Sequence, residues 1–367
     1  MDSPVARIAD AFALPGRLAH AAPYGSGHIN DTFAATFHGT PGDRRYIFQR
    51  INENIFKNSA ALMENISRVT AAAAARLAAD HTPDAGRRTL RLVPTRNGQS
   101  AFRDAEQRLW RCYDFIEGAK TYDVIESPRQ AYEAARAFGG FQKLVAGLPG
   151  PRLHETIPNF HHTRSRFERL REVAAADPQG RLSSVQPEWD FIRRREDCVD
   201  TLLGLAATGQ IPERVTHNDT KLNNVMIDDA TQEGVCVIDL DTVMPGLALY
   251  DFGDLVRTAT SPASEDERDL SRVRMQMTMF EALARGYLSS AADFLVPQEI
   301  AHLVFAGKLI TLETGIRFLT DYLEGDVYFK TKRPGHNLDR CRTQLALVRS
   351  IEEQQPAMDQ VVRKAVA

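Results

Sequence analysis

The sequence predicts an α+β protein of two lobes, in which a small antiparallel sheet carrying one helix precedes a larger, mostly helical part. The chain has 367 residues, more than one hydrophobic core usually organises. Its first third has the order strand, strand, helix, strand, strand, and the remainder has mostly helical periodicity. The linker-like segment "EGAKTYDVIESP" lies between them, so we expect lobes of 1–117 and 118–367.

In the first lobe, aromatic and β-branched residues mark the strands. "TFAATFHG" and "RRYIFQRI" are expected strands separated by the turn "GTPGD". Residues 56–80 carry apolar side chains at helical spacing and predict one long helix. Two more strands are expected at 90–96 and 109–118, with the turn "NGQSAFRD" between them.

In the second lobe, apolar residues recur at helical spacing in six segments. Helices are expected at 128–148, 165–177, 188–209, 272–288, 297–323 and 341–355. A strand pair around 215–240 interrupts them, with the polar sequence "DDATQEG" as the turn of a hairpin.

Composition excludes several classes of protein. The net charge is −3 with 25% charged residues, so no global basic excess indicates nucleic-acid binding. The N-terminus has early acids and is a poor signal peptide, and no apolar run reaches 18 residues. Four dispersed cysteines without C-x-x-C spacing favour reduced thiols. We expect a cytoplasmic protein with neither a membrane nor a nucleic-acid partner; the sequence does not determine its oligomeric state.

A polar cluster lies around the expected hairpin, in "RVTHNDTKLNNVMID" and "CVIDLDTVMPG". The hairpin would bring the 219–224 loop close to Asp239. A carboxylate such as Asp219 can accept a hydroxyl proton, and the oxygens of Asn224 and Asp239 can hold Mg²⁺. Phosphoryl transfer needs these parts, because its barrier is mainly positioning and charge neutralisation.

The alternative is that these residues only cap turns, as Asp and Asn often do. Asp228 and Asp229, at the hairpin tip, are assigned to that structural role. For the complete H-x-D-x-x-x-x-N pattern with its downstream acid, the functional interpretation is preferred.

"HNDTKLNN" followed by "VIDLDTVMPGLALYDFGD" resembles the aminoglycoside phosphotransferase and choline kinase superfamily, which has a protein-kinase-like two-lobe fold. The resemblance implies ATP and Mg²⁺ as cofactors, Asp219 as the catalytic base, and Asn224 and Asp239 as metal ligands. It also implies that His217 braces the loop, and that Lys221 either approaches a phosphate or is solvated.

"YDFGD" contains Asp251-Phe252-Gly253, which copies the metal-binding triplet of protein kinases. Because Asp239 already occupies the position of that ligand, we interpret the triplet as a coincidence. Asp251 and Asp254 are expected to support the loop instead. The short interval from Asp239 to Asp251 leaves no room for an activation loop, which argues against a protein kinase.

The first lobe is expected to bind the nucleotide. In "YGSGHINDTF", glycines would let backbone amides approach phosphates, although an ordinary hairpin turn is the alternative. "YIFQRIN" lacks the strand-three lysine of protein kinases, so Gln49 or Arg50 takes its place, with Glu64 as a possible partner of the arginine. Backbone groups of the hinge strand "RCYDFIEG" would bind adenine. The expected nucleotide-binding residues are Gly25, Ser26, Gly27, Gln49, Arg50, Asp114, Phe115, Ile116 and Lys221.

A closer resemblance, over most of the chain, is to N-acetylhexosamine 1-kinases. It includes "GSGHINDTF", "HNDTKLNNVMID" and the late "ETGIRFLTDYLEGDVYFKTKRPGHNLDRCRTQ". It implies transfer from ATP to the C1 hydroxyl of a small-molecule sugar, N-acetylglucosamine or N-acetylgalactosamine, held by Asp219, Arg317 and Tyr328. Arg317 could instead pair with Asp321, and Tyr328 could belong to the core. The family's C-terminal tryptophan has no counterpart, which leaves the exact sugar open.

Other classes make different demands on the sequence. A kinase for choline, homoserine or aminoglycosides would need an acidic or aromatic pocket for a cationic acceptor. A nucleotide-binding relative without activity would lack Asp219, Asn224 or Asp239, and all three are present. A metal-dependent hydrolase would usually carry more histidine ligands than His217.

Overall fold

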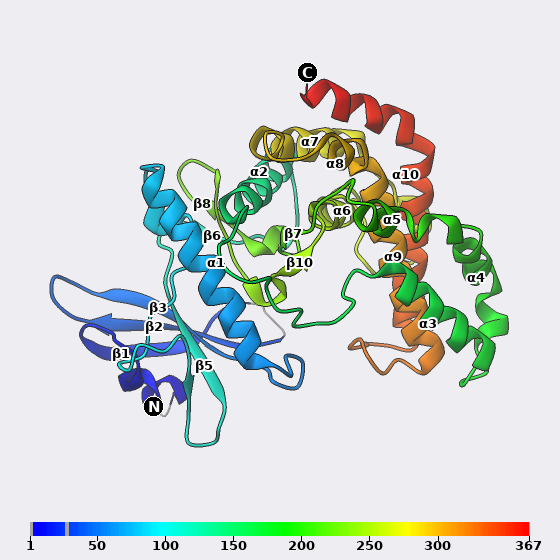
Figure 1. Cartoon of the computed structure of the whole chain (residues 1–367). Coiled ribbons are helices and arrows are strands. Elements are labelled where there is room, and N and C mark those ends of the chain that lie inside the picture. The colour runs from blue at the N-terminus through cyan, green and yellow to red at the C-terminus, as the bar shows by residue number, and fades with distance from the viewer. Residues whose placement is uncertain (1–2, 26–28, 367) are drawn as a thin grey trace. The chain divides into compact units, whose positions relative to one another are not determined.

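A computed structural model of the chain describes residues 3–25 and 29–366. They form two compact parts (Figure 1). The first part comprises Met1–Lys120, Leu144–Pro158 and Met226–Met244, and the second comprises Thr121–Lys143, Asn159–Val225 and Pro245–Ala367. Compactness places 144–158 and 226–244 in the first part, although both stretches follow residue 117 in sequence. The functional division expected near residue 117 therefore stays a prediction.

The first part contains the predicted antiparallel sheet, with five strands in the order β1-β2-β3-β5-β4. The strands are β1 (Arg17–Pro23), β2 (Asp31–His38), β3 (Arg44–Arg50), β5 (Leu109–Asp114) and β4 (Phe102–Arg103). Their register sets Phe33 opposite Phe48, and Phe48 opposite Cys112. A slip of one residue would move this apolar set to the opposite face, so burial fixes the register.

The N-terminal residues complete the core of this sheet. Two 3₁₀ helices, Pro4–Arg7 and Ala9–Ala11, bring Val5 and Phe12 into one buried cluster with the strands. The ring of Phe12 lies edge-on to that of Phe48, with the centroids 5.5 Å apart. Removing a buried aromatic side chain of this kind costs about 3–5 kcal/mol.

The predicted long helix is confirmed as α1 (Ser59–Ala79). The Asn58 side chain caps it by accepting a hydrogen bond from the Ala61 amide, at 3.1 Å. Its buried stripe, at residues 62, 66, 69, 73 and 77, has helical spacing. The strand expected at 90–96 is wrong: only Leu92 and Thr95 make isolated bridges there. Pro94 has no N–H to donate, which prevents a continuous ladder.

The predicted hairpin after residue 215 is also confirmed. A three-stranded sheet has the order β6 (Ala119–Lys120), β8 (Val225–Asp228) and β9 (Gly234–Val237). Asp228 closes the turn, because its Oδ1 accepts from the amides of Ala230 and Thr231 at 2.9 and 2.8 Å. These amide bonds and Arg87 lower the pKa of Asp228 to about 2. The structural role predicted for Asp228 is therefore confirmed.

The second part is mostly helical, as predicted. Its helices are α2 (Pro128–Val145), α3 (Thr163–Ala176), α4 (Gln186–Arg193), α5 (Thr201–Ala207), α6 (Ala248–Ala259), α7 (Met277–Ala291), α8 (Pro297–Ala301), α9 (Leu303–Glu324) and α10 (His336–Val366). One core joins α3, α4, α9 and α10 through residues such as Phe167, Ile316 and Leu345. A short sheet of β7 (Arg214–Thr216) and β10 (Met244–Gly246) lies before α6 in sequence.

Three helix predictions differ from the structure. The helix expected over 188–209 is interrupted, because 193–197 are five consecutive charged residues with no apolar stripe to bury. The helix expected over 297–323 is divided at His302 into α8 and α9. The C-terminal helix is longer than expected and continues through Pro356.

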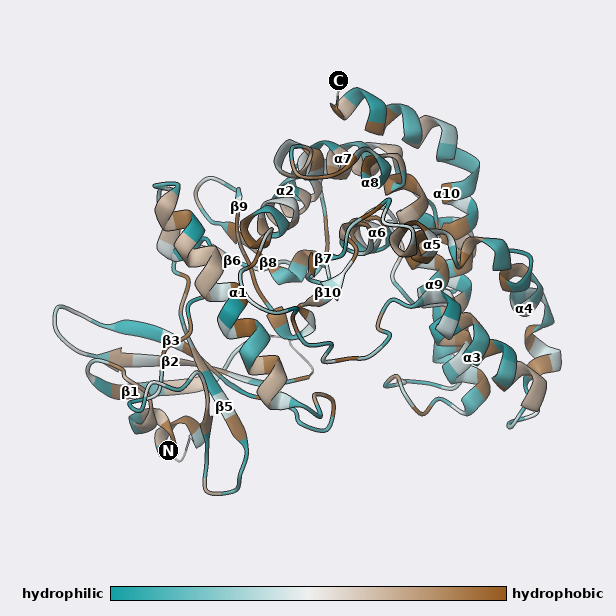
Figure 2. Cartoon of the chain, viewed as in Figure 1, coloured by the Kyte–Doolittle hydropathy of each residue, from teal (hydrophilic) through white to brown (hydrophobic). Residues whose placement is uncertain are grey.

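Figure 1 shows α10 changing direction toward the C-terminus, and an internal proline is a common cause of such bends. Figure 2 shows hydrophilic and hydrophobic residues interspersed along α10. Its buried residues include Cys341, Leu345, Val348 and Ile351, so one face lies in the core. Within the described stretches, no helix combines the length and the apolar character needed to cross a membrane.

Helix α6 was not predicted, and it contains the Asp-Phe-Gly triplet. Gly253 lies where α6 crosses α9: a Cβ there would lie 2.5 Å from the carbonyl oxygen of Ala306. A Cβ at Gly307 on α9 would likewise lie only 2.8 Å from Cγ1 of Val256 on α6. The glycine of the triplet is therefore explained by helix packing, independently of any metal.

Candidate active site

The loop between β7 and β8 brings three predicted site residues together. Asp219 accepts hydrogen bonds from Lys221, whose Nζ lies 2.8 Å from Oδ1 and 3.0 Å from Oδ2. Asn224, in the 3₁₀ helix Leu222–Asn224, donates its Nδ2 to the Asp219 carbonyl at 2.8 Å and to Oδ2 at 3.3 Å. The Asp219 side chain is 27% exposed, so the carboxylate is held by two neighbours and still reaches solvent.

Electrostatics hold Lys221 in its charged form. Burial would lower its pKa, but the attraction of Asp219, their hydrogen bond and the charge of Asp254 together raise it. A protonated Lys221 therefore lies against the carboxylate of the predicted base.

The backbone of the loop is fixed by two buried acids of α6. The carboxylate of Asp251 accepts from the amides of His217 and Asn218 at 2.9 and 2.7 Å, and from the Gln142 side chain at 2.6 Å. Asp254 accepts from the amide of Thr220 at 2.9 Å. The prediction that Asp251 and Asp254 support the loop is confirmed.

The two acids differ in their electrostatic surroundings. Burial raises the pKa of Asp251, against the opposing effect of His217 and the amide donors. For Asp254, the cations Arg257 and Lys221 outweigh burial and lower the pKa. Asp254 is thus part of a charged network that includes Lys221.

His217 lies within the loop's own packing. Its ring is fully buried and edge-on to Phe138 of α2, with the centroids 5.2 Å apart. Its Nδ1 accepts from the Asp219 amide at 3.3 Å. These contacts agree with the predicted bracing role.

A third buried acid, Glu313 on α9, was missed by the sequence analysis. It accepts from His161 Nδ1 at 2.9 Å and from Thr163 Oγ1 at 2.5 Å. The other ring nitrogen of His161 lies 3.4 Å from the carbonyl oxygen of Asn218, the residue before Asp219. Burial would raise the pKa of Glu313, but His161, Thr163 and Arg317 lower it.

The predicted acceptor-binding residues Arg317 and Tyr328 lie near this acid in sequence and share one aromatic neighbour, Phe329. The Arg317 guanidinium is 5.5 Å from the ring centroids of both Phe160 and Phe329. Tyr328 is 68% exposed, so the alternative that it belongs to the core is wrong. The Asp321 carboxylate accepts hydrogen bonds from the backbone amides of residues 327–329 and so anchors this loop. The alternative in which Arg317 pairs with Asp321 is therefore wrong.

A second arginine, Arg166, meets the same aromatic residue. It donates to the Phe160 carbonyl at 3.2 Å, and its Nε is buried with no hydrogen-bond partner among the described residues. Burial and the nearby charge of Arg317 lower the pKa of Arg166. Two guanidinium groups therefore lie around Phe160, and sequence spacing gave no sign of the second.

In the first part, Asp239 directly precedes the 3₁₀ helix Leu240–Thr242 and has a φ of 59°. A left-handed conformation at a non-glycine residue needs support from its surroundings. Asp241 in this turn is buried and forms an ion pair with Arg111 of β5. Neither Arg111 nor Asp241 was among the predicted site residues.

The two candidates for the strand-three position differ in their contacts. The Gln49 side chain accepts from Arg111 Nε and Nη2 at 2.9 and 2.8 Å. Arg50 pairs with Asp31 on the neighbouring strand instead. Glu64 interacts with His154 at 2.9 Å, so the expected pairing of Arg50 with Glu64 is wrong. The buried cation of this sheet is thus Arg111, from β5.

The remaining nucleotide-binding predictions lie on the first part. Gly25 has a φ of 79°, in the region that favours glycine, whereas Ser26 and Gly27 lie outside the described residues. The amides of Asp114 and Phe115 donate to the carbonyls of Arg91 and Arg45, at 3.0 and 3.2 Å. Because those two amides are already bonded, Ile116 is the hinge residue whose amide is the candidate donor to the adenine ring.

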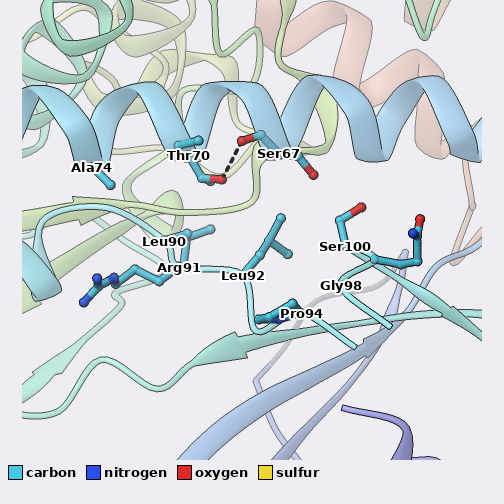
Figure 3. Close-up of a pocket in the computed structure, with 11 residues that line it drawn as sticks. Ser67, Thr70, Ala74, Leu90, Arg91, Leu92, Pro94, Gly98 and Ser100 are labelled. Carbon is cyan, nitrogen blue, oxygen red and sulfur yellow. Dashed lines mark hydrogen bonds between the residues drawn. The ribbon is translucent and has the colours of Figure 1, made fainter. Parts of the chain in front are cut away.

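A pocket of about 290 Å³ also lies in the first part, between α1 and residues 90–100 (Figure 3). The side chains of Ser67 and Thr70 on α1 and of Leu92 on the facing segment line it. None of the predicted site residues that the structure describes belongs to its lining, so it is separate from the predicted chemistry.

Comparison with known proteins agrees with the fold. The chain is similar to an aminoglycoside phosphotransferase from Alicyclobacillus acidocaldarius, at a TM-score of 0.59 and 13% identity, covering 100% of this chain and 97% of that one. It is also similar to a choline/ethanolamine kinase family protein from Mesorhizobium loti, at a TM-score of 0.52 and 16% identity, covering 98% and 97%. Spectinomycin phosphotransferase, solved with ADP and spectinomycin, gives a TM-score of 0.50 and 14% identity over 95% and 93%.

At these identities the structural likeness shows a shared fold, and it confirms the protein-kinase-like architecture predicted from the sequence. The model of the phosphotransferase enzyme family matches residues 20–292, well over half of the sequence. The chain therefore belongs to the phosphotransferase enzyme family.

Proposed function

We propose that this phosphotransferase transfers the γ-phosphoryl group of ATP to the C1 hydroxyl of an N-acetylhexosamine, giving ADP and the sugar 1-phosphate. The observation that carries the proposal is the Asp219 carboxylate, partly exposed and held by Lys221 and Asn224 in a loop fixed by two buried acids. Such a rigid carboxylate suits a base that must meet one hydroxyl in one orientation.

In this mechanism Asp219 orients the C1 hydroxyl and accepts its proton. The sugar oxygen forms a bond to the γ-phosphorus as the bond from that phosphorus to the β–γ bridging oxygen breaks, and ADP leaves with that electron pair. Lys221 holds the Asp219 side chain in place before the reaction through their ion pair. It is also the cation available to the transferred group if its side chain turns from the carboxylate.

Asn224 and Asp239 are the residues that would hold Mg²⁺. The amide nitrogen of Asn224 is used by Asp219, so its side-chain oxygen is the atom left for a cation. An amide oxygen and a carboxylate are the hard donors that Mg²⁺ prefers, so the residues fit this ion. When bound, Mg²⁺ supplies charge neutralisation at the phosphates.

The acceptor is proposed to lie against Arg317 and Tyr328. An arginine fork can donate to sugar hydroxyls and to the acetamido carbonyl, and an exposed tyrosine adds a flat face and a hydroxyl. The pair Arg166 and Arg317 around Phe160 supports a neutral, oxygen-rich acceptor over a cationic one, because two guanidinium groups repel an ammonium.

The test is a substrate panel. Purified protein is incubated with ATP, Mg²⁺ and, separately, N-acetylglucosamine, N-acetylgalactosamine, glucose, choline, homoserine and kanamycin, and the products are followed by ³¹P and ¹H NMR. We expect a phosphate coupled to the anomeric proton of an N-acetylhexosamine. Turnover confined to choline, homoserine or kanamycin would reject the sugar in favour of another small-molecule kinase.

A further inference from the structure

Arg111 and Asp241 form a buried ion pair in the first part. Their side chains are only 1% and 5% exposed. A buried charge is tolerated when its partner and its hydrogen bonds are in place, so both residues must be held accurately.

Each end of the pair is fixed by a different segment. On the Arg111 side, Gln49 of β3 accepts from Nε and Nη2, and Gln49 itself donates to Thr32 of β2 at 3.1 Å. On the Asp241 side, Oδ1 is paired with Arg111 and Oδ2 accepts from the Asn30 side chain. The oxygen of Asn30 accepts the amide of Asn52 at 2.9 Å. The pair thus joins β3 and β5, the residues just after the glycine-rich segment, and the 240–242 turn.

These contacts limit what Asp241 can do. The sequence "IDLD" offers two carboxylates, but both oxygens of Asp241 are engaged by donors from Arg111 and Asn30. A carboxylate neutralised in this way is a poor ligand for a cation. Asp241 is therefore excluded as a ligand for Mg²⁺.

The pair also acts on Asp239 through the backbone. Asp241 belongs to the single 3₁₀ turn that Asp239 precedes, and Asp239 has the left-handed φ described above. Anchoring Asp241 fixes this turn, and the turn sets the direction of the Asp239 side chain two residues away. Burial would lower the pKa of Arg111, but the charge of Asp241, with a smaller contribution from Asp239, raises it.

We propose that Arg111 and Asp241 are a positioning pair, which orients Asp239 for the cation and couples that orientation to the segment that follows the glycine-rich sequence. The inference rests on the proposed function in one respect, that Asp239 holds Mg²⁺. It gives Arg111 of β5 a role as the buried cation of this sheet, in which strand three lacks the lysine of protein kinases.

The test measures cation binding independently of turnover. Mn²⁺ replaces Mg²⁺, and its affinity for the full-length protein in the presence of ADP is measured by electron paramagnetic resonance. The double variant Arg111→Gln/Asp241→Asn keeps two neutral, hydrogen-bonding side chains in place of the ion pair. We expect Mn²⁺ to bind about 10–100-fold more weakly, as is typical when residues that orient metal ligands are replaced. ADP affinity without metal should stay within about twofold.

Matched controls separate positioning from stability. Arg103→Gln/Glu53→Gln removes an exposed ion pair of the same first part and should leave Mn²⁺ affinity unchanged. Arg111→Lys keeps the buried charge but loses the guanidinium fork that reaches both Gln49 and Asp241, so we expect an intermediate loss of Mn²⁺ affinity. This variant keeps the test possible if the double variant folds poorly. Thermal unfolding of each variant reports the structural contribution separately.

The outcomes distinguish the two proposals. Parent-like Mn²⁺ affinity in the folded double variant or in Arg111→Lys would overturn the positioning role while leaving the parent's kinase activity intact. Weakened Mn²⁺ binding in the variants, combined with no sugar turnover by the parent, would support the positioning pair and reject the N-acetylhexosamine. Absence of ADP-dependent Mn²⁺ binding in the parent would overturn both.

Discussion

Gly253→Ala should destabilise the second part, although alanine is normally the better helix residue. The added methyl group would lie 2.5 Å from the Ala306 carbonyl oxygen and 2.7 Å from Ile310 Cγ1. A side-chain rotation can relieve the second contact, but the first is with backbone of α9 and requires the helices to separate. Overpacking of this kind costs about 1–3 kcal/mol, and alanine returns roughly 1 kcal/mol of helix propensity. Taking the upper end for a backbone clash, we expect a net loss of about 2 kcal/mol.

The assay is denaturant-induced unfolding followed by circular dichroism, with Gly140→Ala and Gly204→Ala as controls. A Cβ at either control position meets nothing within 4 Å, so those variants should be stabilised by about 0.5–1 kcal/mol. The same substitution is thus expected to have opposite signs where a neighbouring helix blocks the added methyl group and where nothing does. A Gly253→Ala protein as stable as the parent would refute the packing argument. If it were stable but failed to bind Mn²⁺, the metal-binding interpretation of the Asp-Phe-Gly triplet would gain support.

Three further predictions concern the site. Asp219→Asn should lower kcat by about 10²–10⁴-fold with little change in ADP affinity, measured by steady-state kinetics and calorimetry; a near-parent kcat would reject the assigned base. Glu313→Gln should reduce the loss of stability on acidification. The folded state lowers the pKa of Glu313 from 4.5, so the ionised carboxylate stabilises the folded protein at any pH above that value. This stabilisation disappears as the pH falls through the lowered pKa, and the glutamine variant has none to lose. Parallel stability curves for parent and variant between pH 6 and 3 would contradict this. Arg317→Gln should raise the KM for the sugar about tenfold while the KM for ATP stays unchanged, and an unchanged sugar KM would remove Arg317 from the acceptor site.

Local patterns were sufficient for most of the fold. Strand-forming residues on either side of a turn predicted β2 and β3, and apolar residues at helical spacing predicted α1. The prediction failed where burial is not periodic. Segment 90–96 looks strand-like by composition, yet Pro94 breaks its ladder, and α6 is buried along most of its length, the acids Asp251 and Asp254 included.

The residues of the candidate site also differ in how far the sequence could predict them. Asp219, Lys221 and Asn224 are close in sequence, so their spacing carries the signal. His161 and Glu313 are separated by 152 positions, and no local pattern links them. Arg111 did leave a trace, as a charged residue inside the apolar strand "LWRCY", and a buried arginine implies an acid elsewhere. The sequence could not identify that acid as Asp241, because only the tertiary fold brings it to β5.

The first part is discontinuous in sequence, and this has a consequence for dissecting the protein. A fragment ending at Lys120 would contain the whole five-stranded sheet but would lack residues 226–244. Arg111 would then be buried without its counter-ion, and Asn65 would lose the Val243 carbonyl to which it donates at 3.0 Å. During synthesis, the sheet cannot reach its final stability until the ribosome has added more than a hundred further residues. An isolated N-terminal fragment should therefore need a peptide spanning 226–244, supplied in trans, to fold.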